Sequence, residues 1–283
     1  MSEFMQEFLV APDPDDPRLT EAVTGIDHEG QERSTRVVVE RPLTIYLNSQ
    51  EIVTAMTVGD HANWLAVGFL ANQNMLRPDD EITGIDIDDE LEAVIVRTAR
   101  KTDYEHRLER RVRTSGCAVG TVFADVMDSF EAADLPADPL YTSWIYTLSA
   151  KIARRPSLYL AAGAIHGCVL CEGDRPILYL EDVGRHNAVD MIAGYMRLND
   201  VSPLGKLFFT TGRLTSEMVI KTVQMGVPIL ISRSGFTASG VSLARQAGLT
   251  LVGRAKGKRF IALSGTERLV FDASPDVASG DAA

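Results

Sequence analysis

The chain has 283 residues, of which 45% are hydrophobic and 24% are charged, and its formal net charge is −11. This balance is typical of a globular protein with a buried core, and the length suits roughly two domains. So acidic a chain has no overall attraction for nucleic acid or for an anionic membrane. Any anion site must therefore be a local cluster of basic residues.

The sequence indicates neither a membrane span nor a secretory signal. No apolar run approaches the ~20 residues that a transmembrane helix needs. The start of the chain is acidic, whereas a signal peptide begins with positive charge and continues with an apolar run. The three cysteines are too few, and odd in number, for a disulfide framework. These features predict a cytoplasmic protein with free thiols.

The two ends of the chain are predicted to be flexible. Residues 1–35 are acidic, contain several prolines and show almost no apolar period, and residues 273–283 are small and polar. Segments of this composition bury too little apolar surface to offset the entropy cost of ordering. We therefore expect structure to begin near Arg36 and to end near Asp272.

Residues 36–135 are expected to form a smaller N-terminal α+β subdomain. Short β-rich runs on either side of polar turns predict two hairpins, over 37–58 and 82–98. Asp60 is placed to cap a helix between these hairpins. A charged strand and a glycine-rich loop around Cys117 follow, and a second helix is expected from Thr121 to Phe130.

Residues 140–272 show a different pattern, in which strands alternate with helices. Such alternation predicts an α/β domain with a largely parallel sheet covered by helices, whose functional loops follow the C-terminal ends of the strands. The expected strands are 162–172, 177–180, 206–210, 227–232 and 249–252, and the expected helices are 142–154, 185–197, 215–225 and 239–247.

One candidate nucleophile is Cys117, in a loop that precedes a predicted helix. Arg110, Arg111 and Arg113 lie upstream, and both guanidinium groups and a helix N-terminus favour the thiolate form of a cysteine. The glycines on either side of Cys117 would let a substrate approach the backbone closely. A small apolar residue at the start of a helix is the competing interpretation, and the residues alone leave the two evenly matched.

Cys168 and Cys171 form a C-x-x-C pair within an apolar, strand-like run. Side chains three residues apart on a strand point to opposite faces of the sheet, which is a poor geometry for two ligands of one metal ion. The sequence contains no second C-x-x-C. We therefore predict that both residues are buried in the core.

The segment from Glu181 to Asn187 places two acids, Arg185, His186 and an amide at one strand-to-helix turn, and His166 lies on the strand before it. So many polar groups at the end of a strand must be exposed or paired. An exposed capping segment with a salt bridge would satisfy them. We favour a functional site, because Arg185 and His186 would lie at a helix N-terminus that faces the edge of a pocket.

Two further strand-to-helix turns combine hydroxyl groups with an arginine. The first contains Thr211, Gly212 and Arg213, and the second contains Ser232 and Arg233. Such groups at a helix N-terminus suit a phosphate or a ribose. Neither turn is a P-loop or a dinucleotide-binding glycine loop, so each alone is a weak signal. Two similar turns at one sheet edge are a more specific indication of an anion site.

A basic cluster follows the last predicted strand. It places four cations among six residues of a strongly acidic chain, namely Arg254, Ala255, Lys256, Gly257, Lys258 and Arg259. A local basic loop of this kind can bind a polyanion. A solvated turn with scattered cations is the common alternative. The contrast with the overall charge favours a ligand.

Several of these segments together resemble the FdhD family of formate dehydrogenase accessory sulfurtransferases, over about residues 41–271. The likeness is carried by the Cys117 loop and by further segments along the chain: Val58 to Asp60 with Leu65 to Leu70, Gly163 to His166, Glu181 to Asp190, Thr211 to Arg213 with Ser216 to Val219, and Ile231 to Ser234. The string E-D-V-G-R-H-N, which begins at Glu181, is long and specific.

The resemblance implies a fold and a function. The main domain of such proteins looks like the cytidine deaminase fold, here a three-layer sheet covered by helices. They accept sulfur from a cysteine desulfurase as a persulfide on a loop cysteine. They bind the molybdenum bis(molybdopterin guanine dinucleotide) cofactor as a substrate and pass it the sulfur before its insertion into formate dehydrogenase.

Residue by residue, the resemblance places the persulfide on Cys117 and cofactor contacts on residues 254–259. The turns at Thr211 and Ser232 are then neighbours of the guanine nucleotide, and His186 belongs to the same cofactor site. A homodimer is compatible with the resemblance. The sequence leaves open both the oligomeric state and which formate dehydrogenase is served.

One departure from the family pattern concerns the loop cysteine. Many members carry a C-x-x-C there, whereas the second position in this chain is Gly120. Release of sulfur from Cys117 would then depend on the acceptor or on a reductant. This departure supports a second hypothesis, in which the protein is a non-covalent chaperone that binds the molybdenum cofactor for formate dehydrogenase.

A third hypothesis, a nucleotide hydrolase or deaminase, rests on the likeness of fold alone, which is weak support. A zinc deaminase needs H-x-E followed by P-C-x-x-C. In this chain His166 is followed by Gly167 and Cys168, and P-C-x-x-C is absent. We therefore predict no tightly bound metal.

Overall fold

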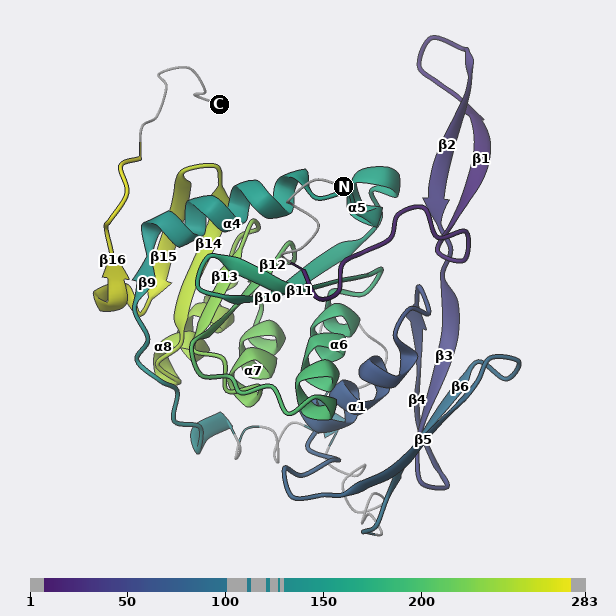
Figure 1. The fold of residues 1–283 in the computed structure, drawn as a ribbon, viewed down its shortest axis with the longest axis horizontal. Coiled ribbons are helices and arrows are strands. Elements are labelled where there is room, and N and C mark those ends of the chain that lie inside the picture. The colour runs from purple at the N-terminus through teal and green to yellow at the C-terminus, as the bar shows by residue number, and fades with distance from the viewer. Residues whose placement is uncertain (1–7, 101–110, 113–120, 123–126, 128–129, 276–283) are drawn as a thin grey trace.

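The computed structural model describes residues 8–100, 111–112, 121–122, 127 and 130–275 (Figure 1). Cys117, Arg110 and Arg113 lie outside the described residues, so what was expected of their surroundings stays a prediction. None of the helices in the described part of the chain has both the length and the apolar character needed to cross a bilayer.

Two short strands flank the position of Cys117 along the chain. Strand β7 (Arg111–Val112) pairs antiparallel with strand β8 (Thr121–Val122). The helix expected to begin at Thr121 therefore does not begin there, because this residue is part of the β ladder.

The C-terminal part of the chain forms a six-stranded sheet. In order across the sheet, the strands are β11 (Arg175–Asp182), β10 (His166–Glu172), β12 (Lys206–Thr210), β13 (Ile229–Ser232), β14 (Thr250–Lys256) and β15 (Arg259–Ser264). β12, β13 and β14 run parallel, and all other neighbours are antiparallel. The expectation of a largely parallel sheet was wrong. Turns at Gly173 and Gly257, both with φ of 58°, connect β10 to β11 and β14 to β15 as hairpins. The two strands of a hairpin are necessarily antiparallel.

Helices cover both faces of this sheet, so the domain has three layers (Figure 1). On one face, α4 (Thr142–Arg154) packs through Ile145, Leu148 and Ile152 against residues such as Val169 and Phe209. The expected apolar stripe of this helix is thus confirmed. The opposite face is covered by α6 (Arg185–Leu198), α7 (Ser216–Gln224) and α8 (Ala238–Gln246).

A second, four-stranded sheet belongs to the N-terminal part. Its order is β4 (Gln50–Thr57), β3 (Arg41–Leu47), β6 (Ala93–Thr98) and β5 (Ile82–Asp88). The two predicted hairpins are confirmed, and β3 joins them by parallel pairing with β6. Residues of this sheet and of the large sheet belong to one continuous hydrophobic core.

Helix α1 (Ala62–Asn72) connects the two sheets by crossing α6 (Figure 1). The residue before the helix is His61, in the left-handed conformation with φ of 52°, and no side chain caps the helix N-terminus. The expected cap at Asp60 is therefore not formed. Leu65 and Leu70 of α1 are fully buried, and their packing holds the helix in place.

A hairpin that projects from the rest of the molecule occupies part of the expected N-terminal tail (Figure 1). Strand β1 (Thr20–Ile26) pairs antiparallel with β2 (Glu32–Val38). The prediction of a tail was wrong here because most residues of the hairpin are exposed on both faces, so the strands lack the apolar alternation of a half-buried sheet. Leu19, at its base, is buried beside Ile165 and anchors it.

Short elements complete the described fold. Helix α5 (Leu158–Ala162) precedes β10, where the expected strand was to begin at Ala162. Strand β9 (Leu140–Tyr141) pairs parallel with β16 (Leu269–Val270), and a single 3-10 turn (Thr266–Arg268) precedes β16. These pairings bring the start of α4 next to the C-terminal end of the described chain.

Candidate functional site

A cavity of about 480 Å³ opens at the carboxyl edge of the parallel strands. Its polar lining comes from Tyr159, His166, Thr211, Arg233, Ser234 and Lys256. The structure thus brings together one member of each of the three basic or hydroxyl-bearing segments, namely Thr211, Arg233 and Lys256. This location follows the general rule that ligands of α/β sheets bind outside the carboxyl ends of the strands. We call this space the edge cavity.

The turn after β12 is held by the neighbouring strand β10. The backbone N–H of Gly167 donates to the hydroxyl of Thr211 at 2.9 Å, and the N–H of Thr211 donates to the carbonyl of Gly167 at the same distance. Thr210, fully buried, donates its hydroxyl to the same carbonyl and accepts the N–H of Gly212. Thr211 is therefore fixed at the cavity wall by paired hydrogen bonds.

The turn after β13 depends on Ser232, whose side chain is fully buried. Its hydroxyl donates to the carbonyl of Gly212 at 2.6 Å and accepts the N–H of Ser234 at 2.9 Å. Ser232 thus ties the two turns together, whereas Arg233 and Ser234 line the edge cavity. The side chain of Ser232 is turned away from any ligand in this space.

The basic segment 254–259 is not a loop but the end of the β14–β15 hairpin. Its side chains alternate: Ala255 is fully buried, whereas Arg254 and Lys256 are exposed. Only Lys256 of the segment lines the edge cavity. Gly257 makes the turn, and the ammonium group of Lys258 donates to the carbonyl of Ser274 at 3.3 Å. Arg259 begins the last long strand.

Two histidines lie near the arginines of this edge. Burial lowers the pKa of His166, and the positive charges of Arg185 and Arg213 lower it further. The Nε2 atom of His186 lies 3.0 Å from a carboxylate oxygen of Glu217, in the first turn of α7. His186 is therefore directed to α7 and is absent from the lining of the edge cavity.

The acids of the E-D-V-G-R-H-N string are structural. Glu181 accepts hydrogen bonds from the backbone N–H groups of Leu158 and Tyr159 and so holds the start of α5. Burial raises the pKa of Glu181. Tyr159, which the sequence did not single out, is thereby placed at the cavity, where the Arg233 guanidinium carbon lies 6.0 Å from its ring centroid.

Asp182 is fully buried and joins the two sheets. Its carboxylate accepts the hydroxyl of Thr57 and the N–H of Val58 from the end of β4, as well as the N–H of Gly184 and the amide of Asn187. Burial raises the pKa of Asp182 to about 6, although these four donors oppose the rise. The competing interpretation of this string, an exposed capping segment with a salt bridge, is wrong for its acids, because Glu181 and Asp182 are buried and accept hydrogen bonds within the fold.

The two described cysteines are confirmed as core residues. Cys168 packs on the α6 face of the sheet and Cys171 on the α4 face, and both are fully buried. Burial raises the pKa of Cys168 to about 12 and also raises that of Cys171. Both burial and the raised pKa disfavour the reactive thiolate form of each cysteine, and neither thiol is accessible to another protein in the folded chain. Within the described residues, no group of three or more His, Cys, Asp or Glu side chains is placed to hold a metal ion.

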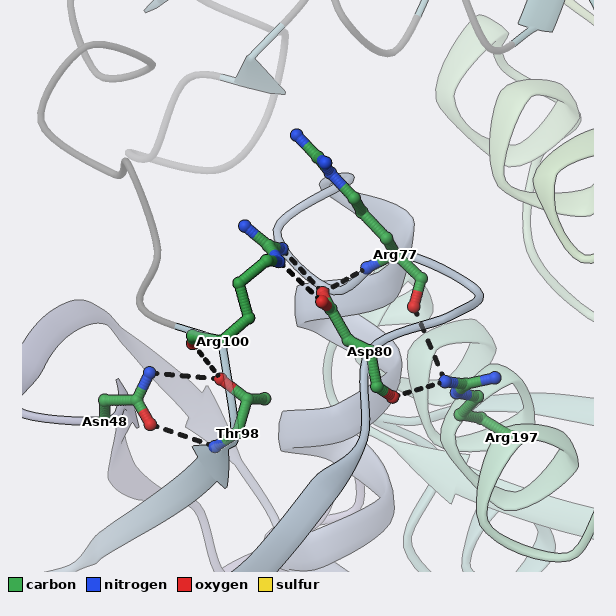
Figure 2. A network of polar contacts seen from close by, with 6 residues as sticks. All are labelled: Asn48, Arg77, Asp80, Thr98, Arg100 and Arg197. Atoms are coloured by element: carbon green, nitrogen blue, oxygen red, sulfur yellow. Dashed lines mark hydrogen bonds and ion pairs between the residues drawn. The ribbon is translucent and has the colours of Figure 1, made fainter.

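A second cavity, of about 600 Å³, opens at the opposite edge of the sheet, where α1, α6 and α7 end. Arg77 and Arg197 line it together with Ala133. Arg100, the last described residue before β7, pairs with the carboxylate of Asp80, next to Arg77 and Arg197 (Figure 2). Arg100 and the edge cavity thus lie at opposite edges of the sheet.

The fold and the edge cavity define an α/β protein whose sheet presents hydroxyl groups and cations at one carboxyl edge. The chain belongs to the FdhD/NarQ family, whose model matches residues 38–270. The resemblance noted in the sequence is thereby confirmed.

Relatives with known names match over most of their length. Two proteins named sulfur carrier protein FdhD are each 30% identical to this chain: one from Bacillus pumilus, covering 81% of this chain and 88% of the relative, and one from Listeria monocytogenes, covering 84% and 93%. A crystal structure from Desulfotalea psychrophila, provisionally described as a formate dehydrogenase accessory protein, superposes with a TM-score of 0.71 at 28% identity. It covers 89% of this chain and 99% of that chain.

Proposed function

We propose that this chain is a sulfur carrier that serves formate dehydrogenase. Membership of the FdhD/NarQ family supports this role, as do the two relatives named sulfur carrier protein FdhD. In this proposal the protein works in the cytoplasm and takes sulfur from a cysteine desulfurase. It then delivers the sulfur to the molybdenum bis(molybdopterin guanine dinucleotide) cofactor as its substrate. Its main domain is then a member of the cytidine-deaminase-like folds, and a homodimer is compatible with this role.

The observation that carries the sulfur assignment is the burial of two of the three cysteines. Cys168 and Cys171 are fully buried with raised pKa values, on opposite faces of one sheet. A persulfide forms by attack of an accessible thiolate, which neither residue can supply. Cys117 is the one remaining cysteine of the chain. We therefore assign the sulfur to Cys117.

The sulfur steps balance without an oxidant. The Cys117 thiolate attacks the outer sulfur of a persulfide on the desulfurase, the S–S bond of the donor breaks, and the donor cysteine leaves as a thiolate. Onward transfer breaks the new S–S bond and returns the Cys117 thiolate. Sulfur then arrives at the oxidation level of sulfide only if two electrons are supplied, by a reduced molybdenum centre or by an external dithiol that becomes a disulfide.

The edge cavity is the proposed site for a guanine nucleotide end of the cofactor. Its volume falls in the range of small-molecule sites. Arg233 and Lys256 supply positive charge for a phosphate, and Thr211 and Ser234 supply hydroxyl groups. These groups gather at a single edge of a chain with a net charge of −11, so the cationic character there is local.

A mass measurement tests the sulfur assignment. We expect the purified chain, incubated with a cysteine desulfurase and cysteine, to gain the mass of one sulfur atom. Cys117→Ala should abolish the gain, whereas Cys171→Ala, which changes a buried core residue, should retain it. A gain that persists in Cys117→Ala would reject the assignment.

A non-covalent chaperone is the second candidate, and one observation supports it. A resolving thiol three residues after Cys117 is missing, because that position is Gly120. If Cys117→Ala fully restores formate dehydrogenase activity in a strain that lacks this gene, the chaperone role holds and the carrier role fails.

A further inference from the structure

Tyr159 places an aromatic side chain at the edge cavity. The residue lines the cavity and is 38% exposed, and its ring faces the guanidinium group of Arg233, which lines the same space. No phenylalanine, tryptophan or second tyrosine is among the described residues of this lining. Binding sites for small molecules combine aromatic and apolar walls with a few placed polar groups. A ligand with a planar ring therefore has one aromatic surface available in the described wall of this cavity.

The backbone of Tyr159 is rigidly held although its ring is partly exposed. The carboxylate of Glu181 accepts the N–H of Leu158 at 2.6 Å and that of Tyr159 at 3.2 Å. Glu181 is 5% exposed and is itself held by the hydroxyl of Tyr179 at 3.1 Å. Leu158 is buried in a cluster with Ile165. The cost of ordering this platform is thus met by the fold before a ligand arrives, which favours binding.

Two cations share the cavity with Tyr159. The N–H of Arg233 donates to the carbonyl of Thr210 at 3.2 Å, so the backbone there is tied to the neighbouring strand. The guanidinium carbon of Arg233 lies 6.0 Å from the Tyr159 ring centroid, at the outer limit of a cation–π contact. Within the part of the chain that the structure describes, no protein group accepts a hydrogen bond from the Arg233 or Lys256 side chain. Their donors are therefore available to an anion.

An aromatic wall and unbonded cations in one cavity suit a ligand that has both a planar ring and an anionic group. A nucleotide has both. A base that stacks on an aromatic side chain gains affinity whatever its identity, because every base has a π face. The phosphates gain affinity from charge, which salt screens. The two contributions can therefore be measured separately.

We propose that Tyr159 binds the base of the nucleotide by stacking, whereas Arg233 and Lys256 bind its phosphates. The nucleotide then lies with its base against α5 and its phosphates toward the ends of β13 and β14. Glu181 does not touch the ligand and acts through the placement of Tyr159. The proposal rests on the proposed nucleotide site in the edge cavity, and it requires nothing of Cys117.

Calorimetry with GDP tests the stacking role by comparing Tyr159→Ala with Leu160→Ala. Leu160 is the next residue of α5, is 58% exposed and is absent from the described lining, so it is a matched control. The N–H that Glu181 accepts remains in Tyr159→Ala. We expect Tyr159→Ala to weaken GDP binding by about tenfold or more, the effect of losing one stacked base. Tyr159→Phe, which keeps the ring, and Leu160→Ala should bind GDP like the parent chain.

Salt separates stacking from an indirect effect on Arg233. The titrations are repeated at about 0.1 M and about 1 M salt, between which the screening length falls from ~10 Å to ~3 Å. The loss of affinity in Tyr159→Ala should be the same factor at both, because the tyrosine ring carries no net charge. The loss in Lys256→Gln should shrink at high salt. A loss in Tyr159→Ala that shrinks in the same way would overturn the proposal, since Tyr159 would then act by placing a cation.

A second variant keeps the proposal testable if Tyr159→Ala folds poorly. Tyr159→Leu retains an apolar side chain but has no π face, so it should bind GDP more weakly than Tyr159→Phe does. Equal affinity in Tyr159→Leu, Leu160→Ala and the parent chain would overturn the stacking role.

The outcomes distinguish this role from the carrier function. GDP binding that depends on Lys256 but not on Tyr159 would reject the stacking role alone. Absence of GDP binding by the parent chain would reject the stacking role together with the nucleotide site. The carrier function would still be decided separately, by the gain of one sulfur on Cys117.

Discussion

Gly68 of α1 and Gly194 of α6 face each other at the closest point of the helix crossing. A Cβ atom added at Gly68 would lie 1.7 Å from the carbonyl oxygen of Asp190, and one at Gly194 would lie 1.9 Å from that of Trp64. No side chain fits at either position, so the two backbones are in direct contact. This contact couples the N-terminal sheet to the helix that begins beside the edge cavity.

The crossing predicts that Gly68→Ala is strongly destabilising. A methyl group there forces the helices apart and disturbs the core on both sides, and such overpacking costs about 1–3 kcal/mol or more. Thermal or urea unfolding would measure the loss. Gly25→Ala is the matched control, because a Cβ at Gly25 meets nothing within 4 Å. Equal stability of the two variants would show that the crossing can relax.

GDP binding should distinguish Lys256 from Lys258. Lys256 lines the edge cavity, whereas Lys258 lies past the hairpin turn, near Ser274. Loss of a charge-assisted hydrogen bond to phosphate costs about 1.5–3 kcal/mol, so Lys256→Gln should weaken GDP binding by about tenfold or more. Arg233→Gln should behave alike. Calorimetry that shows the same affinity for Lys256→Gln and Lys258→Gln would place the nucleotide elsewhere.

Thiol labelling should be confined to Cys117 in the native protein. Burial raises the pKa of Cys168 to about 12 and raises that of Cys171, so neither forms a thiolate near neutral pH or admits a reagent. Iodoacetamide should therefore modify one cysteine without denaturant and three with it. Peptide mass mapping identifies the positions. Labelling of Cys168 in the native state would mean that the sheet opens locally.

Asp182 makes stability depend on pH. Its folded pKa of about 6 lies above its ordinary value of 3.8, so the folded state holds this proton more tightly than the unfolded state does. The contribution is fully present below about pH 3.8 and is lost as the pH rises through about 6, by about 3 kcal/mol at 1.36 kcal/mol per pKa unit. Asp182→Asn has no titrating group there.

Urea unfolding at several pH values tests this claim. The stability of Asp182→Asn relative to the parent chain should rise between pH 4 and pH 7, because only the parent then carries a buried charge. Asp86→Asn, which removes an exposed carboxylate, should show no such trend. A constant difference between Asp182→Asn and the parent over this range would mean that the four hydrogen-bond donors hold the carboxylate ionised throughout.

Elements with a strong local pattern were predictable to within a residue or two. The expected helix 142–154 coincides with α4, and the expected strand 206–210 coincides with β12. The spacing of Ile145, Leu148 and Ile152 is itself the cause of the helix burying one face. The burial of Cys168 and Cys171 on opposite faces likewise followed from the period of a strand.

The candidate site was predictable only in outline. The rule that loops after parallel strands meet at one edge of the sheet correctly predicted that Thr211 and Arg233 lie close together. The rule did not show that Lys256 lines the cavity whereas its neighbours Arg254 and Ala255 do not. That distinction needs the strand alternation of β14, which extends further than the apolar run indicated. Tyr159 carried no recognisable signal, because its place depends on the hydrogen bonds that Glu181 makes to the start of α5.

Apolar periodicity and the family motifs involve residues that are close together in the sequence, so both could be recognised without a structure. The partners of buried polar groups are distant in the sequence and could not be recognised in this way. Thr57 donates to Asp182 across 125 positions of sequence, and Asn72 donates to Asp190 across 118. Such pairs form only when the sheets and helices have docked, since the free energy that drives docking comes from the burial of the whole core and not from any one segment. For this reason the acids of the E-D-V-G-R-H-N string are bonded within the fold, while the cavity beside them takes its lining from five separate regions of the chain.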